Sequence, residues 1–296
     1  MSMAVIAVVI AALYFGGALG SIGSLILVRY GVMERGMLGK QVLALGAVLG
    51  IVCSPISANA VEWTVGLGGG VAPDYEGSDE YELVPLWNIR ANDLYDPNTY
   101  VQVLGPKLNS NFLPHNNLRL GLSGQYVAER DGVENDQVDS LSSTDDGFML
   151  GALLGYDFKL SGNRVWGFEF DPRWDVSDDI GGLFTLRTHY IAPFGGSWRF
   201  RGGIETTYAS EDYMDEYFSI SAADSAASGL NTFNADDGFK DVGVNASLTY
   251  QFAGNWSTTG LVRYTRLLED AEDSPVTDDA GDENQFFSGL LINYSF

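Results

Sequence analysis

Regular alternation of apolar and polar residues is the feature that most restricts the fold of this chain. Between 242 and 252, valine, alanine, leucine, tyrosine and phenylalanine occupy every second position, and glycine or polar residues lie between them. Successive side chains of a strand point to opposite faces, so this stretch predicts a strand with one apolar and one polar face. The alternation recurs at 118–126, 148–158 and 198–209. Stretches of about ten residues match the length that a tilted strand needs to cross a bilayer.

A soluble β-sandwich also alternates, and three further features favour a membrane barrel. Aromatic residues stand near the predicted strand ends, as expected of interfacial girdles. Tight connections at 161–163, 195–196 and 253–255 alternate with long acidic ones at 129–146, 211–241 and 269–283. The last stretch is amphipathic and ends in Phe296, which resembles the signal read by the barrel-insertion machinery of the outer membrane. The aromatic residues in question are Trp166, Tyr190, Trp198, Tyr208, Tyr250, Trp256 and Tyr264.

Counting strands back from the C-terminus sets the predicted size of the barrel. The segment 98–113 is ambiguous because Gly105-Pro106 can divide it into two short strands. Division gives twelve strands and no division gives eleven, and bacterial barrels usually have an even number. We therefore predict an all-β, transmembrane, antiparallel up-and-down barrel of about twelve strands, with ten as the alternative if 61–70 lies outside the wall. The long acidic connections are then extracellular and the short turns periplasmic. The other predicted strands are 61–70, 80–90, 117–128, 146–160, 163–174, 179–192, 197–210, 241–252, 255–268 and 284–296.

Residues 1–60 differ in kind from the rest of the chain. Arg35 and Lys40 precede an apolar stretch at 42–52, and Ala58-Asn59-Ala60 is a small-residue cleavage site. This order is that of an export signal. We predict a cleavable signal over about 33–60, cut after Ala60, and an outer-membrane barrel domain over 61–296.

The segment before the signal has two interpretations. Residues 4–28 carry no charge and are long enough to span a bilayer as a helix. Either synthesis begins at Met33 or Met37, or the chain has an additional hydrophobic segment. We favour the later start, and no helix is then expected to remain in the mature protein. The single cysteine, Cys53, lies in the part predicted to be removed.

The charge of the chain restricts its partners. The formal net charge is −23, and residues 1–60 contain only one of the acidic residues. Binding to nucleic acid or to anionic lipid through a basic surface needs many lysines and arginines, so this composition argues against both. Acidic loops facing solvent fit it. Outer-membrane lipid and lipopolysaccharide are the expected surroundings.

Four segments resemble one known family. They read APDYEGSDEY at 72–81, YFSISAADSAASGL at 217–230, RLLEDAEDSP at 266–275 and NQFFSGLLINYSF at 284–296. Together they resemble the MipA/OmpV family of outer-membrane proteins over essentially all of 61–296. The resemblance implies a non-enzymatic barrel that ties a membrane-bound lytic transglycosylase to a murein-synthesising penicillin-binding protein. Other members of this family are described as surface proteins related to adhesion or osmolarity, so the resemblance implies such a role as well.

The chain contains two histidines, and neither predicts catalysis. His189 shares its inferred inward face with Arg187, whereas its neighbours Thr188 and Tyr190 point outward. A hydrolase would need a serine or aspartate within reach of the imidazole, so we interpret His189 as a polar residue of the interior. His115 falls in Pro114-His115-Asn116-Asn117, which predicts a solvated turn. We assign no catalytic residue, no cofactor and no metal.

Acidic pairs and interior charges complete the candidate sites. The pairs Asp145-Asp146, Asp178-Asp179, Asp236-Asp237 and Asp278-Asp279 offer oxygen ligands for Ca²⁺ or Mg²⁺, but none has the spacing of a known loop motif, and solvated loops are the simpler interpretation. The alternation also places charges of both signs inside the barrel, where they can pair and close it. A narrow or plugged pore is therefore favoured over a general diffusion channel. The charges predicted to face inward are Arg119, Asp157, Lys159, Glu169, Asp171, Arg187, Arg199, Arg201, Glu205 and Arg263.

Three functions are compatible with these patterns. A scaffold for murein-synthesising and murein-hydrolysing enzymes ranks first. A narrow channel, or a surface receptor or adhesin with acidic outer loops, ranks second. A hydrolase that uses His189 ranks third. The very short periplasmic turns count against the scaffold, because few residues face the side on which murein enzymes work.

Overall fold

The computed structural model describes residues 61–177 and 180–296. The predicted signal, its cleavage after Ala60, the choice of start codon and Cys53 lie outside the described residues, as does the pair Asp178-Asp179. The barrel prediction falls almost entirely within them.

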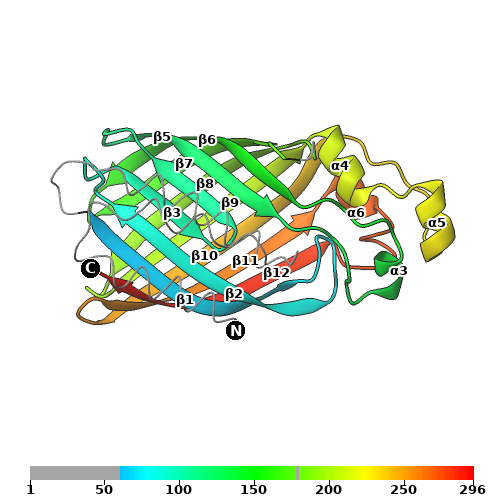
Figure 1. Cartoon of the computed structure of the whole chain (residues 1–296). Helices are drawn as coiled ribbons and strands as arrows, with labels where there is room; N and C mark the ends of the chain where they lie inside the picture. Colours follow the sequence, from blue (N-terminus) through cyan, green and yellow to red (C-terminus); the bar gives the residue numbers. More distant parts are fainter. Residues whose placement is uncertain (1–60, 178–179) are drawn as a thin grey trace, which may run out of the picture. The chain divides into compact units, whose positions relative to one another are not determined.

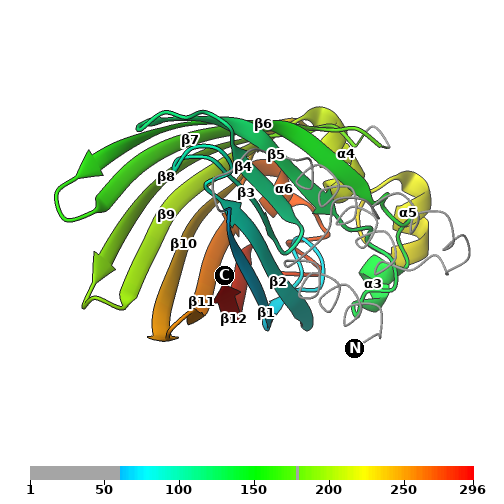
Figure 2. The ribbon, with the colours of Figure 1, turned by 60° about the vertical axis from the view of Figure 1, so that its left-hand side comes forward.

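The described part of the chain forms a closed antiparallel barrel of twelve strands, in which each strand pairs with the next and β1 pairs with β12 (Figures 1 and 2). The predicted division of 98–113 is confirmed, because β3 and β4 lie on either side of Gly105-Pro106. The ten-strand alternative is wrong, because β1 pairs with both β2 and β12 and so belongs to the wall. The strands are β1 (Glu62–Pro73), β2 (Tyr81–Asn92), β3 (Tyr100–Leu104), β4 (Lys107–Asn111), β5 (Leu118–Val127), β6 (Gly147–Leu160), β7 (Arg164–Asp175), β8 (Gly182–Phe194), β9 (Trp198–Ala209), β10 (Gly238–Ala253), β11 (Trp256–Leu267) and β12 (Asn284–Ser295).

The outward face of the wall is apolar, as the alternation predicts. On β12, Phe286, Leu290 and Ile292 are all more than half exposed, whereas the alternate residues Leu291 and Asn293 are buried. An exposed apolar face on every second residue is what lipid contact requires. Aromatic rings form belts on this face: Trp174, Phe184, Tyr208 and Phe239 contact one another in turn across β7 to β10.

Both chain ends of the barrel lie at the end with tight turns. The Trp63 amide donates to the Phe296 carbonyl over 3.0 Å, so the first and last strands are joined at this end. The β8–β9 turn needs Gly195 and Gly196 because both have positive φ, of 58° and 74°. Consecutive positive φ angles are those of the hairpin turn that matches strand twist, and glycine adopts them without strain. This is the periplasmic end.

The prediction that no helix remains is wrong. The described residues contain four short helices, α3 (Asp136–Asp139), α4 (Glu211–Phe218), α5 (Ala222–Ser228) and α6 (Glu269–Asp273). All lie in the long outer connections, at the end opposite the C-terminus (Figure 1). None of the helices in the described part is long and apolar enough to cross a bilayer.

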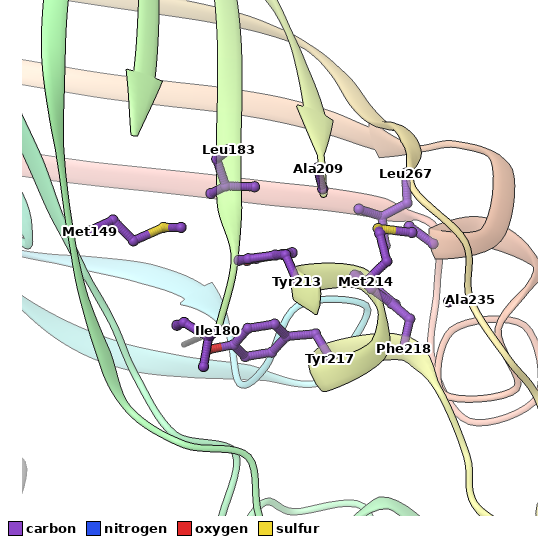
Figure 3. Packing of buried hydrophobic residues seen from close by; sticks show 11 residues of the cluster. Met149, Ile180, Leu183, Ala209, Tyr213, Met214, Tyr217, Phe218, Ala235 and Leu267 are labelled. Atoms are coloured by element: carbon purple, nitrogen blue, oxygen red, sulfur yellow. The ribbon is translucent and has the colours of Figure 1, made fainter. Parts of the chain in front are cut away.

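The outer connections at 74–80, 128–146, 210–237 and 268–283 fold together into what we call the outer cap. From α4, Met214 and Phe218 are fully buried, and they belong to the same apolar cluster as Leu183 and Leu267 of the strands (Figure 3). Leu183 and Leu267 alternate in phase with the inward-facing charges of β8 and β11, so α4 packs into the outer mouth of the barrel. A second apolar cluster contains residues from all four of these connections.

The interpretation of these connections as simply solvated acidic loops is therefore wrong. In the sequence EDYMDEYF of α4, the apolar side chains recur one helical turn apart, at positions 213, 214, 217 and 218. Residues four apart lie on one face of a helix, so the acidic residues face outward while one apolar stripe is buried.

Candidate functional site

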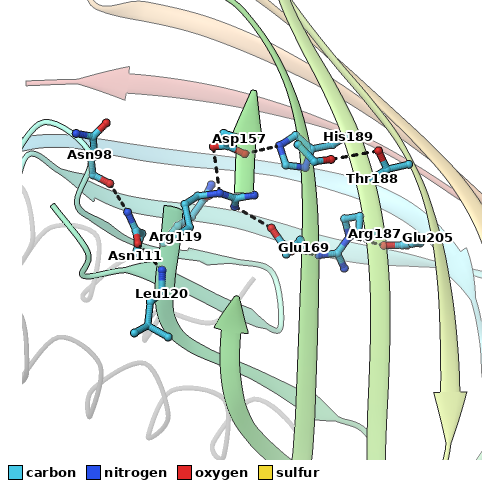
Figure 4. A network of polar contacts seen from close by, with 12 residues as sticks. Asn98, Asn111, Arg119, Leu120, Asp157, Glu169, Arg187, Thr188, His189 and Glu205 are labelled. Atoms are coloured by element: carbon cyan, nitrogen blue, oxygen red, sulfur yellow. Dashed lines mark hydrogen bonds and ion pairs between the residues drawn. The ribbon is translucent and has the colours of Figure 1, made fainter. Parts of the chain in front are cut away.

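The interior wall carries a row of alternating charges at mid-height (Figure 4). Glu169 on β7, Arg187 on β8 and Glu205 on β9 are direct cross-strand neighbours. Arg187 forms ion pairs with both carboxylates, and its Nε lies 2.7 Å from Glu205 Oε2. Arg119 Nη1 on β5 lies 2.8 Å from Glu169 Oε2, and Arg263 Nε on β11 lies 2.9 Å from Glu205 Oε1. The predicted inward orientation of these five residues is confirmed, and their pairing follows the wall from β5 to β11.

Inward-facing glycines allow charged side chains to meet across an intervening strand. Gly155 on β6 pairs with both Arg119 and Glu169, and a Cβ there would lie 2.9 Å from Arg119 Nη2. Gly167 on β7 stands in the same way between Asp157 and His189, and a Cβ there would lie 2.4 Å from Asp157 Oδ1. The ion-pair network therefore depends on the absence of two side chains.

His189 lies in the interior, as predicted, and has a carboxylate beside it. Its Nε2 is 3.5 Å from Asp157 Oδ1, and the histidine is only 3% exposed. Asp157 also forms an ion pair with Arg119, with 3.1 Å between Oδ2 and Nε. The adjacent hydroxyl, that of Thr188, accepts from Trp166 on the outward face. The aspartate that a histidine-based hydrolase would need is thus present, and it is held in an ion pair with arginine.

A second group of inward cations has no carboxylate partner. Among the described residues, Lys159, Arg199 and Arg201 form no ion pair within 4.0 Å, and all three are exposed at the periplasmic half of the wall. Arg90 on β2 is held by amides, with 2.7 Å from its Nε to Asn92 Oδ1 and 2.8 Å from its Nη1 to Gln102 Oε1. The interior therefore combines a neutralised network at mid-height with free positive charge below it.

Polar contacts at the base of the outer cap close the upper interior. Lys240 of β10 forms ion pairs with Asp241 and with Glu76 of the β1–β2 connection. Glu76 also accepts from the Tyr213 hydroxyl of α4, at 3.0 Å. Burial raises the pKa of Tyr213 well above its usual range, with the nearby Glu76 carboxylate adding to the effect, so this phenol stays a donor. Side chains from three distant parts of the chain thus meet beneath α4.

Two of the three described acidic pairs, Asp145-Asp146 and Asp236-Asp237, form contacts with distant segments. The Asp145 amide donates to Glu216 Oε1 at 2.7 Å, and Asp146 accepts from the Tyr126 hydroxyl at 3.1 Å. The Asp236 amide donates to Asp270 at 2.7 Å, and Asp237 accepts from Tyr208. Within residues 61–177 and 180–296, no three His, Cys, Asp or Glu side chains are grouped as a metal site requires. These two pairs connect the outer connections to one another and to β5 and β9, whereas the amides of Asp278 and Asp279 donate to the nearby Ser274 and Pro275 carbonyls.

Some charged residues of the interior were missed from the sequence. Arg90 follows Asn88 with the spacing of an inward face in the β2 sequence ELVPLWNIRAN, and that spacing was the available signal. Arg173 pairs with Asp171 at 3.5 Å on β7, also with two-residue spacing. Lys240 gave no such signal, because a register shift between Phe239 and Asp241 interrupts the alternation.

His115 and the two longer periplasmic connections form one local structure. His115 Nδ1 accepts from the amides of Asn117 and Leu118, at 3.1 and 2.9 Å, as expected of a turn. Asn111 Nδ2 donates to the Asn98 carbonyl at 2.6 Å, and the Tyr95 hydroxyl donates to the Phe112 carbonyl. We call the segments 93–99 and 112–117 the periplasmic turn pair.

Comparison with known proteins places this barrel in a family. The family described as MltA-interacting protein MipA matches residues 65–296. Proteins called MltA-interacting protein from Escherichia coli (strain K12) and Shigella flexneri are each 38% identical to it over 153 residues. That alignment covers 51% of this chain and 51% of each relative, so the chain spans about half the length of the curated relatives it matches.

Two solved barrels are similar in fold. The NanC porin has 9% identity and a TM-score of 0.43, and the alignment covers 79% of this chain and 99% of the porin. An outer membrane channel from Pseudomonas putida F1 has 13% identity and a TM-score of 0.43, with 82% and 99% covered. We infer nothing about activity from either. The family match, by contrast, covers nearly all of the barrel domain, and the chain therefore belongs to the MipA family of outer-membrane β-barrels.

Proposed function

We propose that the barrel is a non-enzymatic outer-membrane anchor that holds a murein lytic transglycosylase at its periplasmic end, as part of a scaffold that also serves a penicillin-binding protein. The observation that carries this proposal is the outer mouth filled by folded loops, in a family named for an interaction. A barrel whose outer mouth is filled by its own loops is better suited to anchoring a partner than to the diffusion of solutes through its interior. The relatives' name, MltA-interacting protein, supports the identity of the first partner.

The periplasmic turn pair is the surface we assign to this partner. Most turns at this end are tight, and the turn pair is the larger ordered feature there, with Tyr95 45% exposed and Phe112 37% exposed. Exposed aromatic residues are favoured at the centres of protein interfaces. This feature answers the objection that few residues face the periplasm.

The test is a crosslinked pull-down of the tagged protein from outer membranes, followed by mass spectrometry. We expect a lytic transglycosylase or a penicillin-binding protein above the level recovered with an unrelated barrel. Tyr95→Ala should reduce that recovery, whereas Tyr81→Ala, an exposed tyrosine at the outer end, should leave it unchanged. Recovery of only lipopolysaccharide and the insertion machinery, which Phe296 is proposed to engage, would remove the anchor proposal.

A narrow channel is the second candidate, and the unpaired cations of the interior favour it. Conductance in planar bilayers separates the two proposals. The anchor proposal expects silent wild-type protein, because the outer cap packs into the mouth. Regular single-channel steps from the intact protein would favour the channel.

The assignment of no catalysis is also open to test through His189. A murein hydrolase activity that disappears in His189→Ala, while folding is retained, would contradict it. Unchanged murein turnover in cells carrying this variant is the expected result.

A further inference from the structure

Two arginines on β9 lack a counter-charge. Arg199 and Arg201 are two residues apart and so share the inward face of Glu205. Both are exposed, and in the described part of the chain no carboxylate lies within 4.0 Å of either. Their two guanidinium groups therefore present unneutralised positive charge to the interior.

A third arginine faces them from the opposite wall. Arg90 on β2 has only neutral partners, Asn92 and Gln102, and its guanidinium carbon lies 4.1 Å from the centroid of the Tyr100 ring. In the closed barrel, β2 and β9 are separated by β10, β11, β12 and β1 in one direction and by β3 to β8 in the other, so the two strands lie on opposite sides of the interior. Tyr100 lies on β3, which pairs directly with β2, so its ring belongs to the same wall as Arg90. Hydrogen bonds to these two side-chain amides and the contact with the Tyr100 ring hold the Arg90 guanidinium in a fixed orientation.

The neighbouring carboxylates are already occupied. Glu169 attracts Arg201, but it accepts ion pairs from Arg119 and Arg187. Asp157 is shared between Arg119 and His189. Three like charges that face the same partly enclosed interior repel one another, and a mobile anion would relieve that repulsion. Guanidinium groups match carboxylate and phosphate oxygens in bidentate geometry.

The same arrangement indicates the side from which a ligand arrives. β9 begins at Trp198, directly after the tight periplasmic turn, so Arg199 stands near the periplasmic opening. The outer cap fills the opposite mouth with buried side chains. An anion that reaches the arginines therefore enters from the periplasm.

We infer that Arg90, Arg199 and Arg201 form a binding site for a small multivalent anion that carries carboxylate or phosphate groups and enters from the periplasm. This site goes beyond the anchor proposal and does not depend on it, because the ligand is bound by the interior rather than by the periplasmic turn pair.

The test uses the folded protein purified from outer membranes in neutral detergent, with titration calorimetry at low ionic strength. The probes are citrate, pyrophosphate and uncharged glucose. We expect binding of at least one anion, no binding of glucose, and weaker binding as salt is added. Comparison of citrate with pyrophosphate distinguishes carboxylate from phosphate as the preferred group.

Variants locate the site. The double change Arg199→Gln with Arg201→Gln should weaken anion binding at least tenfold, and the corresponding double change to lysine should retain part of it. Arg164→Gln is the matched control, because this arginine alternates in phase with outward-facing Trp166 at the same end of the barrel. Heat-modifiable migration on gels confirms that each variant is folded.

Two results would overturn the inference. One is wild-type protein that binds neither anion. The other is binding that survives the double glutamine change, or that Arg164→Gln abolishes equally. Loss of the partner in the pull-down with normal anion binding would remove the anchor proposal alone.

Discussion

The two ends of the barrel are built in opposite ways from the same twelve strands. At the outer end, long connections rich in acidic residues fold into a cap with its own apolar core. At the periplasmic end, most connections are tight turns, and the interior just above them carries unpaired arginines. The net charge of −23 therefore conceals a positive interior. Overall charge describes the loops of this protein and says little about the surface that a ligand would meet.

The largest expected effect tests whether the outer cap is a folded unit. Phe218 is fully buried in the cap, so Phe218→Ala should destabilise it by about 3–5 kcal/mol through lost burial and a remaining cavity. Hydrogen exchange at 211–218 should accelerate while the strands stay protected. The control is Val176→Ala, a residue that is 61% exposed, with an expected change within about 0.5 kcal/mol. If hydrogen exchange at 211–218 were equally fast in Phe218→Ala and Val176→Ala, the cap would not be a packed unit.

The next effect tests the charge network at mid-height. Glu205→Ala leaves Arg263 without its carboxylate and Arg187 with only Glu169, and a broken buried pair of this kind costs about 3 kcal/mol. Denaturant unfolding of the barrel measures this loss. Asp279→Ala removes an exposed carboxylate of the outer cap and should change stability by less than about 1 kcal/mol. If Glu205→Ala and Asp279→Ala lowered the free energy of unfolding by similar amounts, the ion-pair network would contribute little to stability.

A smaller effect tests the role of the inward-facing glycines. Gly167→Ala places a Cβ 2.4 Å from Asp157 Oδ1 and 2.6 Å from His189 Nε2, so these side chains must move, at a cost of about 1–3 kcal/mol. Gly260→Ala on β11 is the matched control, because nothing lies within 4 Å of its Cβ position. Unfolding midpoints that shift equally would show that the space at Gly167 is not needed.

The smallest expected effect is a pH dependence confined to the outer cap. Tyr75 is buried, its hydroxyl donates to the Ala280 carbonyl at 2.8 Å, and burial raises its pKa from 10.0 to about 12. The folded cap therefore favours the protonated phenol, and this contribution is complete below pH 10 and is lost as the pH rises towards about 12. Cap opening, followed by hydrogen exchange of the 275–280 segment, should increase over that range. Tyr75→Phe should lose this component of the pH dependence. Identical pH profiles of hydrogen exchange in the wild-type protein and in Tyr75→Phe would contradict a role for the Tyr75 phenol.

The wall of the barrel was predictable because its signal is local. In β6 to β12 the alternation shows which side chains face lipid, and by itself it places Glu169, Arg187 and Glu205 inside the barrel. Even the division at Gly105-Pro106 followed from local backbone preferences and an even strand count. The partners within the interior were less accessible, because Arg119 reaches Glu169 across Gly155, and only the register of three strands shows that this gap exists.

The sequence by itself determined an outer-membrane barrel, a count of twelve strands and the inward face of β6 to β12 apart from the register shift at Lys240, because a period of two and a minimum strand length are imposed residue by residue by the bilayer. Only the tertiary structure decided that the acidic connections form a packed cap, and that Arg90 lies on the wall opposite Arg199 and Arg201. The reason is physical: burial in the cap and the pairing of interior charges depend on segments that are distant in the sequence, and the local pattern carries no information about which of them come together.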